Sequence, residues 1–130
     1  LEGNSGPYLQ YTHARICSVL RRAKIAGLQA FFPTQPPAEL NFVDEEESLL
    51  RTIYKFPELV IEAGENYAPN LLANFLFDLA QKYNLFYNKL PIIKAETESL
   101  RDFRLALTAA VGQVIKNGLY LLGIEAPEKM

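Results

Sequence analysis

The sequence predicts an all-α fold, a bundle of about five helices in a single domain spanning residues 1–130. Three observations support this prediction. Five stretches repeat apolar residues at helical spacing, proline, glycine or capping residues separate them, and no stretch shows the strict alternation of a strand. A chain of 130 residues is long enough to bury a core of its own, so we expect a folded, predominantly helical monomer.

The first helix is expected over residues 7–24, with Ser5 as its N-cap and Pro7 in its first turn. Its core face carries Leu9, Ile16, Leu20 and Ala23. The opposite face is aromatic and basic, and it carries Tyr11, Arg15, Ser18 and Arg22, with Tyr8 beside them. The two tyrosines therefore do not belong to the core stripe of their own helix.

Residues 25–43, which contain Gly27 and three prolines, are expected to form an irregular connection. Asp44 is predicted to cap a short second helix, whose first turn holds three glutamates that the helix dipole favours. The third helix is predicted to start at Pro57 and end near Gly64.

The fourth helix is expected from Pro69 to about Lys89, and its apolar residues on two sides place it at the centre of the bundle. The fifth begins at Glu98 or Ser99 and repeats apolar residues at nearly heptad spacing. Within it, Gly112 and Gly118 each cost about 1 kcal/mol relative to alanine. We expect another backbone to approach them closely. Gly123 is a predicted C-cap, after which "IEAPEKM" trails off as a terminal tail.

Composition and charge exclude several classes of function. The net charge of −2 argues against a general nucleic-acid binder, although residues 8–24 and 82–94 are locally basic. Cys17 and His13 are the only residues of their types, which excludes an intramolecular disulfide and a Cys/His zinc cluster. Nothing resembles a membrane span or a secretory signal, so a cytoplasmic protein without a membrane partner is expected. A start at Leu1 suggests a piece of a longer protein.

Motifs for phosphate cradling, metalloprotease chemistry or a serine nucleophile do not occur, so no catalytic residue is assigned. The polar face of the first helix remains as a candidate site. A tyrosine ring can stack on an unpaired base, and an arginine one turn away can bind phosphate. The alternative is that the tyrosines pack against another helix while the arginines are solvated, and spacing alone favours that alternative.

Three segments nevertheless resemble one family. "GPYLQYTHARICSVLR" at 6–21, "YAPNLLANFLFDLAQKYNLFYNKLPI" at 67–92 and "RLALTAAVGQVIKNGLYLLGIEAPEKM" at 104–130 are similar to the C-terminal anticodon-binding domain, of the DALR type, of arginyl-tRNA synthetases. They cover more than half the chain in the family's order. The resemblance implies recognition of the anticodon stem and loop of tRNA(Arg). An upstream catalytic domain of the same chain would then bind ATP and magnesium and attach arginine, while this fragment holds no cofactor and charges no tRNA alone.

The resemblance also implies site residues. The loop at Asn4 and Ser5 would approach the anticodon loop, and Tyr11 and Arg15 would contact its nucleotides. The "FY" pair, Phe86 and Tyr87, would border the base pocket, which Met130 would help to form. From the polar face of the first helix we also expect Tyr8 and Arg22 to contact the tRNA. Three alternatives stay open: the related domain of a glycyl-tRNA synthetase β subunit, a helical protein-interaction module, and a packing module without a ligand.

Overall fold

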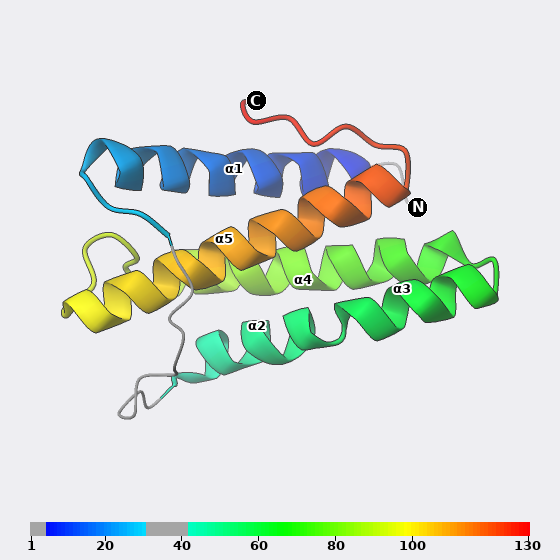
Figure 1. Ribbon diagram of the computed structural model, residues 1–130, viewed down its shortest axis with the longest axis horizontal. Coiled ribbons are helices and arrows are strands. Elements are labelled where there is room, and N and C mark those ends of the chain that lie inside the picture. The colour runs from blue at the N-terminus through cyan, green and yellow to red at the C-terminus, as the bar shows by residue number, and fades with distance from the viewer. Residues whose placement is uncertain (1–4, 31–41) are drawn as a thin grey trace.

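Five helices make up the fold of the computed structural model, which describes residues 5–30 and 42–130 (Figure 1). They are α1 (Ser5–Ile25), α2 (Asp44–Tyr54), α3 (Phe56–Glu65), α4 (Pro69–Lys89) and α5 (Glu98–Leu121). No strand occurs in either described range, so the all-α prediction is confirmed. Asn4 and most of the expected 25–43 connection lie outside these ranges.

The helix α4 lies at the centre of the bundle, as its two-sided apolar pattern predicts. It contacts each of the other four helices, while α2 and α3 follow one another along the edge opposite α1 (Figure 1). The largest fully buried side chains come from every helix except α3, and they include Leu9, Ile16, Leu49, Leu76, Leu79, Tyr83, Phe86, Leu105, Ile115 and Leu119. This core fixes the positions of α1 and α4 relative to one another.

The N-terminus of α2 corrects one sequence prediction. Asp44 is the first helical residue rather than the cap, and Val43 holds the extended N-cap conformation. The side chain of Glu46 supplies the capping contact, since its Oε1 accepts a hydrogen bond from the Val43 N–H at 3.1 Å. A capping box has two hydrogen bonds, one to the N-cap side chain and one from the N-cap N–H to the side chain three residues later. The valine side chain has no acceptor, so only the second bond, to Glu46, forms here.

The glycines of α5 are closely approached, but by side chains rather than by another backbone. A Cβ at Gly112 would lie 2.7 Å from Ile16 Cγ2, and one at Gly118 would lie 2.5 Å from Leu76 Cδ1. Both neighbours are buried in the core. Because Gly112 and Gly118 have no side chain, large residues of α1 and α4 can pack directly against the α5 backbone at these two positions.

The residues after Gly123 do not simply trail off. They run back along α1 (Figure 1), and three side chains of that helix bind their carbonyl oxygens. The donor–acceptor distances are 2.9 Å from Gln10 Nε2 to Glu125 O, 2.8 Å from His13 Nδ1 to Pro127 O, and 3.1 Å from Arg21 Nη1 to Glu128 O. The tail, defined here as residues 124–130, is therefore a docked part of the fold.

Candidate nucleic-acid interface

The exposed face of α1 forms one wall of a cavity of about 420 Å³, which we call the Tyr11 pocket. Its lining comes from α1, α4 and the tail, and consists of Tyr11, Ala14, Arg15, Ser18, Arg21, Arg22, Tyr87, Lys129 and Met130. Three arginines and one lysine line it, and no acidic side chain of the described residues does. Two aromatic rings among four cations suit a ligand that is both flat and anionic.

Two contacts fix the orientation of Arg15 within this pocket. Its Nη1 donates a hydrogen bond to Asn84 Oδ1 at 2.8 Å, and its Cζ lies 4.6 Å from the centroid of the Tyr87 ring. This second contact is a cation–π interaction. A guanidinium has five N–H donors, so donors remain for a ligand after the bond to Asn84. These contacts hold Arg15 in place and leave some of its N–H donors free for a ligand.

Asn84 is the central polar residue behind this face, and the sequence analysis missed it. Its Nδ2 donates to the hydroxyl oxygen of Tyr8 at 2.9 Å and to Thr12 Oγ1 at 3.0 Å. The side-chain amide therefore links three residues of α1 to α4. A signal was present in the sequence, since Asn84 lies three residues before Tyr87 and so shares its helix face.

Tyr8 and Tyr11 have different surroundings, although they lie one turn apart. The ring of Tyr8 is half-buried, with its centroid 5.2 Å from that of Phe77, so for this residue the packing alternative describes what the structure contains. Tyr11 is 61% exposed, and its ring pairs with no other aromatic ring in the described part of the chain. Only the second ring is free for stacking.

Phe86 requires a correction. Its side chain is 0% exposed, its ring centroid lies 5.7 Å from that of Tyr83, and it does not line the Tyr11 pocket. Adjacent helical residues point about 100° apart, so Tyr87 faces the pocket while Phe86 faces the core. Ser5 lies at the far end of α1 and does not line the pocket either. Asn4 lies outside the described residues.

Met130 lies at the pocket because the tail is docked on α1. Arg21, which binds Glu128 O, also lines the pocket, so the same helix holds the tail and faces its last residues. Lys129, which the sequence analysis did not single out, adds a cation there. The tail thus brings a thioether and an ammonium group to the aromatic and basic face of α1.

Neither a metal centre nor a membrane span emerges from residues 5–30 and 42–130. They contain no group of three or more histidine, cysteine, aspartate or glutamate side chains placed to hold a metal ion. They also contain no helix with the length and apolar character needed to cross a membrane. Burial, with a further contribution from the Glu128 carboxylate, raises the pKa of the Cys17 thiol, which disfavours the reactive thiolate.

Comparison with known proteins gives a family match and several relatives. The sequence model of the family described as "DALR anticodon binding domain" matches residues 9–130. The chain is 44% identical over 128 residues to an arginine–tRNA ligase of Porphyromonas gingivalis, covering 98% of this chain and 21% of the relative. A ligase of the same name from Phocaeicola vulgatus is 46% identical over the same length and with the same shares covered.

The fold also matches a solved arginyl-tRNA synthetase of Thermus thermophilus, with a TM-score of 0.82 and 38% identity over 99% of this chain and 22% of that one. A synthetase of Plasmodium falciparum gives a TM-score of 0.74 at 25% identity, covering 99% and 22% of the two chains. The chain spans about a fifth of the length of these relatives. On the match over residues 9–130, the chain belongs to the family of DALR anticodon-binding domains.

Proposed function

We propose that this chain recognises the anticodon stem and loop of tRNA(Arg), as the anticodon-binding domain of an arginine–tRNA ligase. The observation that carries the proposal is the Tyr11 pocket, where a ring that is 61% exposed lies among four cations. Family membership supplies the ligand class, and the names of the two ligases reported above supply the amino acid.

The pocket's residues would divide the work of recognition. The ring of Tyr11 would stack on a base that has left the stack of the loop, and Arg15 would donate to the edge of that base or to its phosphate. Arg22 and Lys129 would neutralise neighbouring phosphates, which position the RNA without reading its sequence. Asn84 would act indirectly, by holding Arg15 in its orientation.

The rest of the ligase would carry the chemistry. The relatives are nearly five times as long as this chain, and their remaining length would hold the domain that uses ATP and magnesium to attach arginine. This domain would supply tRNA affinity and anticodon selection to a monomeric, cytoplasmic enzyme. By itself it would form no arginyl-adenylate.

The substitution Tyr11→Ala tests the proposal. Base–aromatic stacking contributes about 1–3 kcal/mol, so affinity for transcribed tRNA(Arg) should fall roughly 5- to 150-fold. The melting temperature should stay nearly unchanged, because the ring is mostly exposed and lies outside the core of α1. Binding is measured by titration at fixed salt, alongside a tRNA with a different anticodon, and stability by thermal melting.

Ile16→Ala is the matched control on the opposite face of the same helix. Ile16 is 1% exposed, so its truncation should destabilise the fold by about 2–5 kcal/mol while the folded molecules still bind tRNA(Arg). If Tyr11→Ala melts early but binds normally, Tyr11 belongs to the packing of the bundle and the proposal is wrong. If both tRNAs bind with equal affinity, the proposal that the chain recognises the anticodon is also wrong.

A further inference from the structure

One histidine of α1 is buried although no step of the proposed recognition involves it. His13 is 5% exposed, and its Nδ1 lies 2.8 Å from the carbonyl oxygen of Pro127 in the tail. A carbonyl oxygen only accepts, so the imidazole N–H donates this hydrogen bond. If the tail moved away, a mostly buried donor would lose its acceptor, which costs more than the loss of an exposed hydrogen bond.

The other two anchors of the tail are exposed to solvent. Gln10 donates to the carbonyl oxygen of Glu125, and Arg21 donates to that of Glu128. Water can take the place of either acceptor at the surface, so each of these two bonds contributes little to docking. His13 is therefore the anchor on which docking of the tail depends most.

The tail is held in two different ways along its length. Ile124 and Ala126 pack against the hydrophobic core, whereas residues 128–130 are exposed. A segment with few buried apolar contacts has low local stability, so the last part of the tail can open while the helices stay folded. His13 binds Pro127 at the boundary between the two parts, where it can control this opening.

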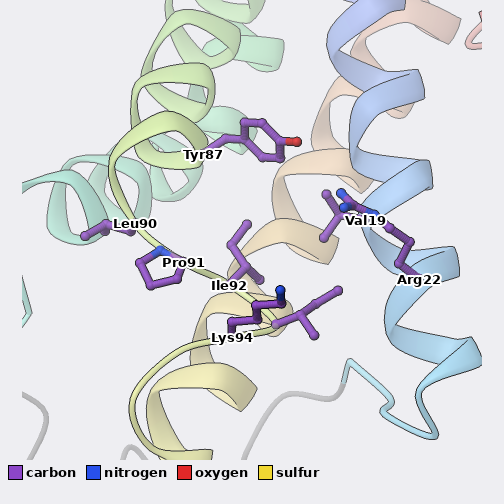
Figure 2. A pocket seen from close by; sticks show the side chains of 8 residues that line it. Val19, Arg22, Tyr87, Leu90, Pro91, Ile92 and Lys94 are labelled. Carbon is purple, nitrogen blue, oxygen red and sulfur yellow. The ribbon is translucent and has the colours of Figure 1, made fainter.

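The part of the tail that can open supplies Lys129 and Met130 to the lining of the Tyr11 pocket. The rest of the lining belongs to packed helices, and Figure 2 shows Tyr87 extending from α4 toward α1, which carries Arg22. Opening of the tail would leave these helical walls in place but remove an ammonium group and a thioether. The pocket is therefore complete only while the tail is docked.

We propose that His13 is a positioning residue, which keeps the tail docked by holding Pro127, and that tail docking and RNA binding at the Tyr11 pocket stabilise one another. The inference rests on the proposed function and adds a coupled equilibrium to it. RNA would bind the docked chain more tightly, because only that state offers Lys129 and Met130. By linkage, bound RNA must favour docking by the same factor.

Cys17, the only cysteine of the chain, is a natural reporter of docking. Its side chain is half-buried, with Sγ 3.8 Å from His13 Nδ1. Burial, and next the Glu128 carboxylate, raise the pKa of the thiol, so the tail acts on this group. Opening of the tail should expose the thiol and remove a nearby negative charge. Both changes should speed its reaction with neutral N-ethylmaleimide.

The first measurement is the labelling rate of Cys17 in the absence of RNA. Removal of residues 125–130 should raise the rate to that of an uncovered thiol. His13→Leu should raise it roughly 2- to 12-fold within that limit, which is the effect of losing one hydrogen bond. His13→Asn should restore slow labelling, because the asparagine side chain has an N–H donor for the Pro127 carbonyl oxygen.

Thr108→Val is the matched control for His13→Leu. Thr108 is also buried and also donates to a carbonyl oxygen, that of Arg104 at 2.8 Å, but both residues belong to α5. The control therefore loses a buried hydrogen bond that does not hold the tail. Its melting temperature should fall, while its labelling rate should stay that of the unaltered chain.

The second measurement adds the anticodon stem-loop of tRNA(Arg) at saturating concentration. It should slow labelling of the unaltered chain by the factor by which removal of residues 125–130 weakens stem-loop binding, and such couplings are typically about 5- to 150-fold. It should not slow labelling of the shortened chain, whose thiol is already uncovered. Thermal melting confirms that both chains are folded.

The outcomes separate this inference from the proposed function. If removal of residues 125–130 changes neither the labelling rate nor the affinity, the tail has no part in binding and only the pocket on α1 and α4 remains. If the stem-loop speeds labelling, RNA displaces the tail, and the proposed coupling has the wrong sign. Equal slowing in the shortened chain would mean that RNA shields the thiol directly, which also refutes the coupling.

The role of His13 has its own refutation. Equal labelling rates for His13→Leu and Thr108→Val, or no restoration by His13→Asn, would show that the Pro127 hydrogen bond does not hold the tail. If the stem-loop does not bind the unaltered chain at all, the proposed function and this inference both fail.

Discussion

Replacing Arg104 with methionine should lower the free energy of unfolding more than replacing any exposed charged residue. Arg104 and Glu46 form an ion pair with 3.0 Å between Nε and Oε2, and their exposed fractions are 6% and 1%. Without the guanidinium, a buried carboxylate loses its partner, which costs about 3–5 kcal/mol. The Pro91 carbonyl also loses its hydrogen bond, so the linker between α4 and α5 should loosen.

A double-mutant cycle isolates the pair. Glu46→Gln removes the charge but keeps an oxygen for the Val43 N–H, and by itself it leaves the guanidinium of Arg104 buried without a carboxylate. The double variant Glu46→Gln/Arg104→Met contains neither unpaired charge. Its loss of stability should therefore be several kcal/mol smaller than the sum of the two single losses.

The assay is urea unfolding followed by circular dichroism, with Arg101→Met as the control. Arg101 lies three residues earlier on α5 and pairs with Asp102 at 3.2 Å, but its side chain is 24% exposed. Such a partly solvated pair is worth about 0–1 kcal/mol. Equal losses for Arg101→Met and Arg104→Met, or additive single losses in the cycle, would refute the reasoning.

Three further substitutions probe the backbone. Gly118→Ala should lower the melting temperature, because overpacking against Leu76 costs about 1–3 kcal/mol and outweighs a helix-propensity gain of about 1 kcal/mol. Gly64→Ala should raise the melting temperature, because a Cβ at this position has open space. If the melting temperature rises for both variants, the Leu76 side chain moves aside to accept the new methyl group. Tyr67→Gly should stabilise by up to about 1 kcal/mol in urea unfolding, since Tyr67 is exposed with φ of 51°. A loss would show that its ring contributes packing.

Helix starts and core residues were predicted well, because both depend on sequence patterns within a single helix. Proline fixes the start of α4 at Pro69, and the apolar stripes determine which residues enter the core. Tyr11 was placed correctly on the exposed face for the same reason. These features depend on spacing within one helix, so they need no knowledge of the neighbouring helices.

Features that depend on a second element were missed or misassigned. Asn84 becomes important only because α4 brings it against Tyr8 and Arg15 of α1. Phe86 and Tyr87 were grouped as a sequence pair, but the packing of α4 against its neighbours places one in the core and the other in the pocket. The approach to Gly118 was expected, yet only tertiary packing shows that a leucine makes it.

The tail is the clearest case of information that side-chain pattern does not carry. Its three anchors on α1 donate to backbone carbonyl oxygens, and every residue has one, so nothing in "IEAPEKM" marks those that are bound. The donors do have a pattern, because Gln10, His13 and Arg21 lie along α1 where the tail runs. Since a carbonyl only accepts, His13 must carry its proton on Nδ1. One helix thus presents Tyr11 to the solvent and also holds the segment that brings Met130 beside it.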